Sequence, residues 1–267
     1  MTRYYSIPTG MQDDTNADKI TWDPMEIFFG SSNHEYAVVI LNQPILLAKS
    51  LMLPMWKKAK IKICVDGGTN RWMEYLDKIA DEVYHGNCSE YTPTFITGDF
   101  DSILPDTIEK LKNISVPIIN TPDQNHTDFS KALMQITGSC KQKNIHLDAI
   151  YVFVETAGRF DHIIGNINTL HQCKKFVDNT VKVINIASNS FTWLLQPGNH
   201  VIKIPEVLRK NNSWVGLIAF GTSTNNVTTS GLKWNLEKLR NFRQQTIKMS
   251  LLGNFYSAVS EILRDLI

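Results

Sequence analysis

The sequence has little that would tie it to a membrane, a nucleic acid or an oxidising compartment. Its net charge is only +1 and it has no basic tract, so nothing indicates a nucleic-acid or membrane-surface partner. No apolar run approaches the roughly 20 residues of a membrane-spanning helix. The four cysteines form no CxxC pair and have no ligand-like spacing with histidine, which is typical of reduced thiols inside cells. We therefore expect a cytosolic protein that binds neither membranes nor nucleic acids.

The common nucleotide-binding and catalytic motifs are missing as well. The chain has no Walker A sequence, no GxGxxG and no HExxH. Its N-terminus shows no basic-then-apolar signal pattern and is too rich in acidic residues for a transit peptide. Any nucleotide must therefore be held by a few placed groups rather than by one of the common phosphate loops.

What is present is a regular alternation of short apolar runs and helical stretches from residue 36 onward. Runs such as YAVVIL, IKICV and AIYVFVE are typical of buried strands, and the segments between them have helical spacing. This alternation predicts an α/β fold with a doubly wound, mostly parallel sheet. Beyond residue 181, strand-like runs joined by Pro, Gly and Asn turns predict a smaller β-rich, sandwich-like domain.

The predicted organisation has three parts. We expect a loosely ordered leader over residues 1–33, a catalytic α/β domain over 34–178 and a β-rich domain over 179–267. Apolar residues near the C-terminus recur at i, i+3, i+4 and i+7 steps, which predicts a helical tail with a helix over residues 251–265.

Four polar segments each follow a predicted strand directly. They are VDGGTNR (65–71), TGDFDSI (97–103), NTPDQNHTDFSK (120–131) and ETAGRFDH (155–162). Because ligands of an open parallel sheet bind beyond the carboxyl ends of its strands, the fold places all four segments along one edge.

Four carboxylates would gather at that edge, from Asp66, Asp99, Asp101 and Asp128. Without a cation they would repel one another, and Mg²⁺ is the hard ion that prefers carboxylate and phosphate oxygens. In an extended Asp-Phe-Asp segment the two aspartates share one side and Phe100 points into the core. Taken alone, this segment fits an acidic turn or a helix cap as well as a metal site. Beside the other three segments, the metal site is favoured.

Two basic residues at the same edge suit phosphate binding. Thr127 is a candidate N-cap, and Asp128 and Lys131 are i, i+3 neighbours that fit either phosphoryl chemistry or a surface ion pair. Arg159 follows a glycine at a strand-to-helix junction, where it can fork onto phosphate. Asp161 orients Arg159, accepts a hydrogen bond from a ribose hydroxyl, or simply starts the helix.

The ordered motifs DGGTNR, GDFDSI, TPDQNHTDFSKAL, GRFDH…NTL and NVTTSGLKWNL closely resemble those of eukaryotic thiamin pyrophosphokinase, over roughly residues 36–237. The resemblance implies transfer of the pyrophosphoryl group of ATP to thiamine, giving thiamine diphosphate and AMP. It also implies Mg²⁺ as cofactor and a homodimer, with thiamine sites between the α/β domain of one subunit and the β-rich domain of the other.

Carried over by position, the resemblance implies a role for each matching residue. The four aspartates would bind Mg²⁺, and Asp99, Asp101, Asp128, Lys131 and Arg159 would form the catalytic group. The nucleotide would be held by Gln124, Thr127, Lys131, Arg159 and Asp161. Thiamine would contact Gln124 and Ser230 and stack on Trp234.

The chain departs from the family pattern after GLKWNLE, where a Ser-x-Ser-Asn-type stretch is replaced by residues with helical spacing. This departure leaves one alternative open: a catalytically impaired relative that still binds thiamine or nucleotide. A third hypothesis is another Mg²⁺-dependent phosphoryl-transfer enzyme or hydrolase on the same sheet edge.

Overall fold

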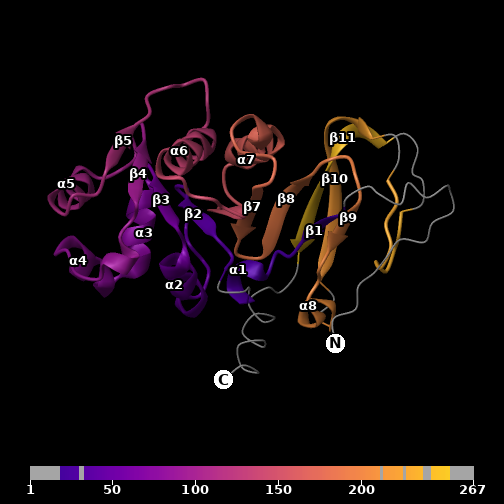
Figure 1. Cartoon of the computed structure of the whole chain (residues 1–267), viewed down its shortest axis with the longest axis horizontal. Helices are drawn as coiled ribbons and strands as arrows, with labels where there is room; N and C mark the ends of the chain where they lie inside the picture. Colours follow the sequence, from indigo (N-terminus) through magenta and orange to yellow (C-terminus); the bar gives the residue numbers. More distant parts are fainter. Residues whose placement is uncertain (1–18, 30–32, 211–212, 225–226, 237–241, 253–267) are drawn as a thin grey trace. The chain divides into compact units, whose positions relative to one another are not determined.

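The computed structural model describes residues 19–29, 33–210, 213–224, 227–236 and 242–252 (Figure 1). These residues belong to two units, one formed by residues 27–188 and the other by the described residues up to 26 together with those from 189 onward. Among the described residues, no helix has the length and apolar character that crossing a bilayer requires.

The unit of residues 27–188 is built around a parallel sheet. Its strands are ordered β7-β6-β2-β3-β4-β5. Their bounds are β2 (Tyr36–Ile40), β3 (Ile61–Val65), β4 (Phe95–Gly98), β5 (Ile118–Asn120), β6 (Ala149–Phe153) and β7 (Lys182–Ala187). The chain moves from β2 outward to β5 and then returns to β6 on the other side of β2. This reversal creates a topological switch point between β2 and β6.

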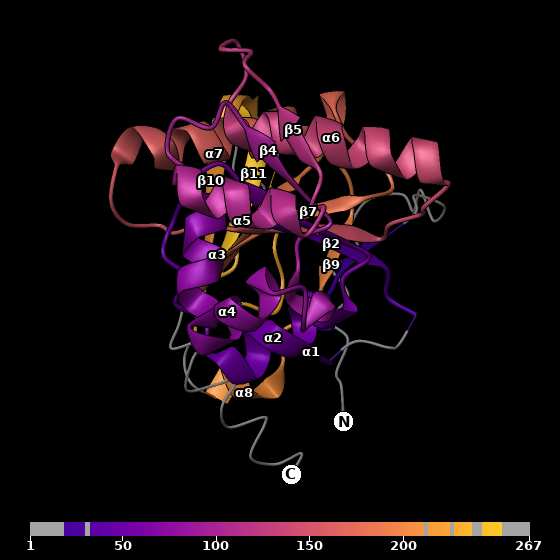
Figure 2. The same cartoon turned by 90° about the vertical axis from the view of Figure 1, so that its left-hand side faces the viewer.

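Helices cover both faces of this sheet. They are α2 (Lys49–Lys58), α3 (Gly68–Leu76), α4 (Lys78–Tyr84), α5 (Pro105–Asn113), α6 (Asp128–Lys143) and α7 (Phe160–Gln172), with α1 (Glu26–Phe29) and the 3-10 turns η1 (Ser89–Tyr91) and η2 (Cys173–Lys175). Figures 1 and 2 agree in showing α6 and α7 on one face and α2 and α3 on the other. Right-handed crossovers require this change of face, because the chain reverses its direction across the sheet after β5.

Each face of the sheet has its own apolar layer. On one face Phe129, Leu133 and Ile136 of α6 are buried against alternate residues of the central strands. On the face of α2 and α3, Trp56 and Trp72 stack at 4.0 Å between ring centroids, and both indole N–H groups donate to the Tyr91 carbonyl oxygen. Burial on both faces explains why the strands read as continuous apolar runs.

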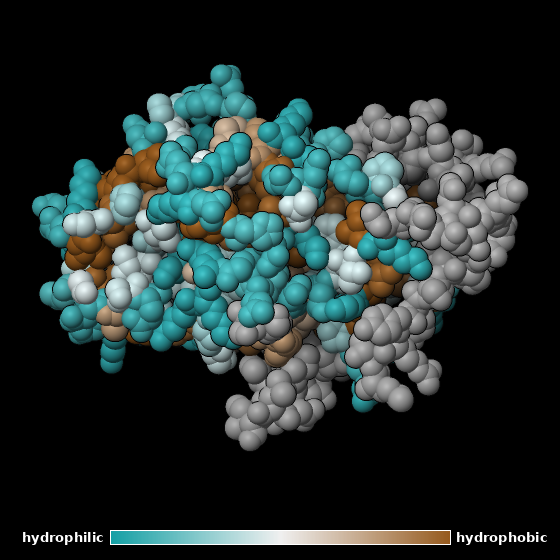
Figure 3. Space-filling view, viewed as in Figure 1, coloured by the Kyte–Doolittle hydropathy of each residue, from teal (hydrophilic) through white to brown (hydrophobic). Residues whose placement is uncertain are grey.

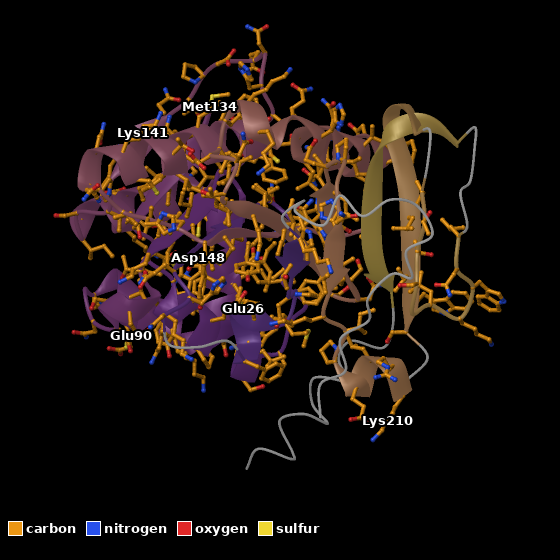
Figure 4. The ribbon with its side chains drawn as sticks, turned by 45° about the vertical axis from the view of Figure 1, so that its right-hand side comes forward. Glu26, Glu90, Met134, Lys141, Asp148 and Lys210 are labelled. Atoms are coloured by element: carbon orange, nitrogen blue, oxygen red, sulfur yellow. The ribbon has the colours of Figure 1, made fainter. Side chains whose placement is uncertain are left out.

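The amino ends of the two central strands are joined by Asp148, which lies just before β6 and is labelled in Figure 4. The Glu35 backbone N–H donates to Asp148 Oδ2 at 2.8 Å, and the Asp148 N–H donates to the Glu35 carbonyl oxygen at 2.7 Å. These bonds fix the start of β6 against the start of β2 at the amino end of the sheet.

The second unit is rich in strands. It contains β1 (Ile20–Trp22), β8 (Ser190–Leu195), β9 (His200–Ile202), α8 (Glu206–Lys210), β10 (Trp214–Thr224) and β11 (Phe242–Leu252). Strand β11 pairs antiparallel with both β8 and β10, and β1 pairs parallel with β9. The predicted class, a doubly wound and mostly parallel sheet followed by a smaller strand-rich part, is confirmed. The described surface is mostly hydrophilic in the view of Figure 3.

The C-terminal segment differs from its prediction. The predicted helix begins at residue 251, whereas Leu251 and Leu252 belong to β11. The helix is therefore wrong there, and residues 253–265 lie outside the described residues. Residues 242–252 contain a period-two pattern, in which Ile247, Met249 and Leu251 alternate with polar residues. In the register these apolar positions face the apolar positions 195, 193 and 191 of β8.

The N-terminal segment also differs from its prediction. The sequence predicts a loose leader over residues 1–33, whereas residues 20–22 form β1. Trp22 stacks on Trp193 at 5.6 Å, and its indole N–H donates to His200 Nδ1 at 3.0 Å. This strand depends on partners about 180 residues away in the chain, so no local pattern indicates it.

A glycine contact at the end of β2 generates the first prediction. A Cβ added to Gly68 would lie 2.4 Å from the Ile40 carbonyl oxygen, whereas one added to Gly138, inside α6, would meet nothing within 4 Å. We expect Gly68→Ala to lower the free energy of unfolding by about 2 kcal/mol or more through overpacking. The matched Gly138→Ala variant should raise it by about 0.5–1 kcal/mol. Urea unfolding measures both, and equal effects at the two sites would contradict the close approach of α3 to β2.

Candidate functional site

The four polar segments predicted from the sequence all follow parallel strands of one sheet. They begin where β3, β4, β5 and β6 end, so the fold places them at the same edge. The predicted arrangement of the segments along the carboxyl edge therefore matches the topology of residues 27–188. Which side chains meet there is a separate matter, because a strand end fixes the position of a Cα and not the direction of its side chain.

Three of the predicted carboxylates come together. Asp66, Asp99 and Asp101 each offer an oxygen, and these oxygens lie within 4.8 Å of one another. Asp66 is only 3% exposed, Asp99 is half-buried and Asp101 is exposed. Hard oxygen donors at this spacing, open to solvent on one side, fit a divalent ion such as Mg²⁺ that keeps part of its water.

The backbone of this cluster is held in uncommon conformations. Asp66 has φ 47° and Phe100 has φ 66°, both in the left-handed region that non-glycine residues rarely adopt. Gly98 has φ 152°, and a Cβ there would lie 2.8 Å from the Cβ of Asp66. The Asp-Phe-Asp segment is therefore not extended, and Phe100 is half-buried rather than pointing into the core as predicted. The turn itself brings the two carboxylates to Asp66.

Hydrogen bonds from Ser102 hold two of the three carboxylates. The Ser102 N–H donates to Asp66 Oδ1 at 3.2 Å, and the Ser102 hydroxyl donates to Asp101 Oδ1 at 2.7 Å. Burial raises the pKa of Asp66, and the nearby Asp101 carboxylate raises this pKa further. The charged form of Asp66 is thus disfavoured until a cation neutralises it.

Gln124 lies beside the acidic group, and its predicted contact with the substrate stays a prediction. Its side-chain amide donates to Asp99 Oδ2 at 3.3 Å, although the residue belongs to the segment after β5. An amide in this position can contact both an acidic ligand and a substrate that approaches the same edge.

Asp128 is not grouped with the other three carboxylates. It lies in the first turn of α6, where its Oδ1 is 2.7 Å from Lys131 Nζ. Lys131 Nζ also donates to the Thr121 carbonyl oxygen at 3.1 Å, and the Lys131 side chain is only 6% exposed. The i, i+3 spacing predicted this ion pair. The metal-ligand role of Asp128 remains a prediction.

Thr127 is the N-cap of α6, as predicted. Its hydroxyl oxygen accepts from the Ser130 N–H at 3.1 Å and lies 2.8 Å from the Thr169 hydroxyl of α7. Thr169 is buried and donates to the Gly165 carbonyl oxygen at 3.0 Å. The start of α6, with Asp128 and Lys131, is therefore fixed against α7.

Arg159 and Asp161 contact each other at the start of α7. Arg159 Nε donates to Asp161 Oδ1 at 3.1 Å, and a terminal guanidinium nitrogen donates to Oδ2 at 2.5 Å. The guanidinium holds the pKa of Asp161 down at about 2. Asp161 thus orients Arg159, which is one of the three roles predicted for it, and both side chains are exposed.

Ser230 and Trp234 belong to the strand-rich unit. They lie in a loop closed by bonds between Thr229 and Leu236, with Gly231 at φ 80°. Trp234 is 68% exposed, and its ring stacks with that of Trp214 at 6.5 Å between centroids. Ser230 is half-buried beside it in sequence. Lys233 Nζ lies 4.7 Å from the centroid of the Trp234 ring, so this ring already makes the kind of cation–π contact that a cationic ligand would make.

Two asparagines near the acidic group were not among the predicted residues. Asn70 of α3 bonds to the loop that carries Asp99 and Asp101. Asn42 follows β2, and its Oδ1 accepts from Arg71 Nε at 3.3 Å. Their positions in the sequence could have indicated both residues. Asn42 follows the end of β2, which is not among the strands before the four polar segments, and Asn70 lies within the VDGGTNR segment.

The raised pKa of Asp66 generates the second prediction. In metal-free protein the folded state binds the Asp66 carboxyl proton more tightly than the unfolded chain does. Ionised Asp66 therefore lowers the free energy of unfolding; this loss is absent below the unfolded pKa of about 4 and grows as the pH rises through the folded pKa. We expect Asp66→Asn to raise the free energy of unfolding in chelator at pH 7, because Asn retains the acceptor for Ser102. Near about pH 4 the gain should vanish. Urea unfolding at both pH values measures this, and a loss of stability at pH 7 would contradict it.

Two domains of one protein family match the chain in sequence. Residues 52–184 match thiamin pyrophosphokinase, catalytic domain, and residues 199–250 match thiamin pyrophosphokinase, vitamin B1 binding domain. Thiamine pyrophosphokinase 1 of Oryza sativa subsp. japonica is 31% identical over 211 residues, which cover 76% of this chain and 74% of that protein. Thiamine pyrophosphokinase 2 of Arabidopsis thaliana is 32% identical over 206 residues, covering 75% and 73%.

Solved structures agree at the level of the fold. The crystal structure of yeast thiamin pyrophosphokinase has a TM-score of 0.70 at 18% identity and covers 94% of this chain and 97% of that one. Thiamin pyrophosphokinase from Candida albicans has a TM-score of 0.62 at 23% identity and covers 94% of each chain.

Proposed function

Because this chain belongs to the thiamin pyrophosphokinase family, we propose that it transfers the pyrophosphoryl group of ATP to thiamine and releases AMP. The resemblance stated from the sequence motifs is confirmed by the family matches and by the plant relatives. The observation that carries the proposal within the chain is the group of Asp66, Asp99 and Asp101, with Gln124 bonded to Asp99. Phosphoryl-transfer sites need such an acidic group to bring ATP phosphates and a divalent ion together.

Mg²⁺ is the cofactor that these residues fit. The donors are carboxylate oxygens, Asp66 is buried, and its charged form is disfavoured in the absence of a cation. Asp66, Asp99 and Asp101 would hold the ion, and Asp128 would join them if it exchanged Lys131 for the metal. When bound, Mg²⁺ supplies charge neutralisation for the ATP phosphates.

The side chains of α6 and α7 supply the remaining charge. The thiamine hydroxyl oxygen forms a bond to the β-phosphorus, and the bond from that phosphorus to the oxygen bridging the α-phosphate breaks, so AMP leaves with the bridging oxygen. Lys131 and Arg159 stabilise the negative charge that spreads over the phosphate oxygens. Lys131 is already fixed by Thr121, and Arg159 by Asp161. The Asp128 carboxylate is the candidate acceptor for the hydroxyl proton.

Nucleotide contacts follow from the same two helix starts. Thr127 and Lys131 stand in the first turn of α6, and Arg159 and Asp161 stand at the start of α7. A helix start offers free backbone N–H groups to phosphate. With Gln124, these residues form the proposed ATP site.

Thiamine would bind through the strand-rich unit. Trp234 would stack on the cationic thiazolium ring in place of the Lys233 ammonium, which lies 4.7 Å from the ring centroid. Ser230 would offer a hydroxyl, and Gln124 would contact the substrate near the reacting group. By resemblance to the family we propose a cytosolic homodimer with the active sites at the subunit interface.

The alternative of a catalytically impaired relative is not favoured. It rested on the missing C-terminal strand motif and on the helical spacing in its place. Strand β11 is nevertheless paired on both sides, and the vitamin B1 binding match extends to residue 250. The third hypothesis, a different phosphoryl-transfer enzyme or hydrolase, lacks support from either family match.

Product identity tests the proposed function. Purified protein with ATP, Mg²⁺ and thiamine should form AMP and thiamine diphosphate in equal amounts, and chelation of Mg²⁺ should stop the reaction. Asp99→Asn and Asp101→Asn should each lower turnover by at least about 100-fold, because each removes a charged metal ligand. Chromatography of the nucleotides and of thiamine diphosphate measures both results.

The matched control is Asp106→Asn. Asp106 is an exposed carboxylate that pairs with Lys110 on α5, and this variant should retain turnover within about twofold. Formation of ADP instead of AMP would contradict pyrophosphoryl transfer. Normal turnover in both metal-ligand variants would show that the acidic group is not the metal site.

A further inference from the structure

The loop between β4 and α5 carries two of the three clustered carboxylates in a conformation that needs support. Phe100 has φ 66° between Asp99 and Asp101, and such a residue keeps this conformation only where its surroundings hold it. Ile103 is buried a few residues further on, which anchors the end of the loop in the core. The segment between Phe100 and Ile103 depends on polar contacts.

Asn70 provides two of these contacts from α3. Its Nδ2 donates to the Ser102 carbonyl oxygen at 3.1 Å, and its Oδ1 accepts from the Leu104 backbone N–H at 3.3 Å. The side chain is half-buried and uses both ends of its amide. The Asn70 amide therefore bonds to the residues on either side of Ile103 and fixes this part of the loop.

The same loop residue links Asn70 to the carboxylates. The Ser102 N–H donates to Asp66 Oδ1, and the Ser102 hydroxyl donates to Asp101 Oδ1. Asp66 lies two residues before the first residue of α3, and Asn70 lies in the first turn of that helix. Asn70 and Asp66 thus hold Ser102 from one rigid element, and Ser102 in turn holds Asp101.

The chemistry of the contacts explains why an amide stands at this position. One partner is a carbonyl oxygen and the other is an N–H group, so the side chain must donate and accept at the same time. A carboxylate has no donor, an alkyl side chain has neither function, and a serine hydroxyl is too short to reach both partners.

We propose that Asn70 is a positioning residue of the metal site: it holds the loop of Asp99 and Asp101 against Asp66 and thereby sets the affinity for the divalent ion. This proposal rests on the proposed function only through the metal site itself. Groups that orient metal ligands contribute to affinity without touching the ion, and their loss typically weakens binding by about 10–100-fold.

Direct binding of Mn²⁺ tests the proposal without reference to turnover. Titration of the full chain with Mn²⁺, followed by the electron paramagnetic resonance signal of the free ion, gives the dissociation constant. We expect Asn70→Ala and Asn70→Ser to weaken binding by about tenfold or more. The control Asn87→Ala removes a similar amide, which donates to Glu82 at the exposed end of α4, and should bind Mn²⁺ like the wild type.

The outcomes separate the two claims. If the wild type binds Mn²⁺ and both Asn70 variants bind it within about twofold of the wild type, the positioning role is overturned while the metal site stands. If the wild type binds no Mn²⁺, the metal site fails and the positioning role fails with it. Unfolding curves of the metal-free variants serve as a second measurement. Weakened binding in a variant that unfolds like the wild type supports the proposal, because a merely structural residue would not change affinity alone.

Discussion

Mutual repulsion among carboxylates is the constraint around which this protein is organised. Three aspartates hold their oxygens within 4.8 Å of one another, one of them almost wholly buried, and no basic side chain is among their hydrogen-bond partners in the described residues. Such a group is unfavourable in an empty site, because burial, with a smaller contribution from the Asp101 carboxylate, raises the pKa of Asp66. A bound cation would replace the repulsion between the three carboxylates by attraction to the ion, and a divalent cation is the simplest such ligand.

The fold opposes this repulsion with rigid elements. Asp66 stands between the end of β3 and the start of α3, and the missing Cβ of Gly68 lets that helix approach the end of β2 closely. Asp99 and Asp101 lie on a turn bonded to α3 through Asn70 and, by way of Gln124, to the segment after β5. The carboxylates are therefore held together by backbone geometry and amide hydrogen bonds. The cationic side chains, Lys131 and Arg159, stand at the starts of α6 and α7 instead.

The sequence predicted the placement of these residues better than their contacts. Alternating strands and helices sufficed for the parallel sheet, and the rule that ligands bind at the carboxyl edge brought Asp66, Asp99 and Asp101 together. Asp128, which was expected in the same group, is instead paired with Lys131, its i, i+3 neighbour on α6. The turn at Phe100 and the bonds of Asn70 were not predictable, since a left-handed residue and a bridging amide leave no periodic signal. Strand β1 depends on a partner near residue 200, and the period-two pattern of β11 was obscured by helical spacing further on.

The central claim is that the three clustered carboxylates at the ends of β3 and β4 form a divalent-cation site. A crystal structure of the protein grown with Mn²⁺, with diffraction data collected near the manganese absorption edge, tests this claim most directly. The account predicts an anomalous peak bounded by Asp66, Asp99 and Asp101, with carboxylate oxygens at about 2.0–2.6 Å from the ion. A fully occupied manganese site elsewhere in the chain, with no peak between these aspartates, would contradict it.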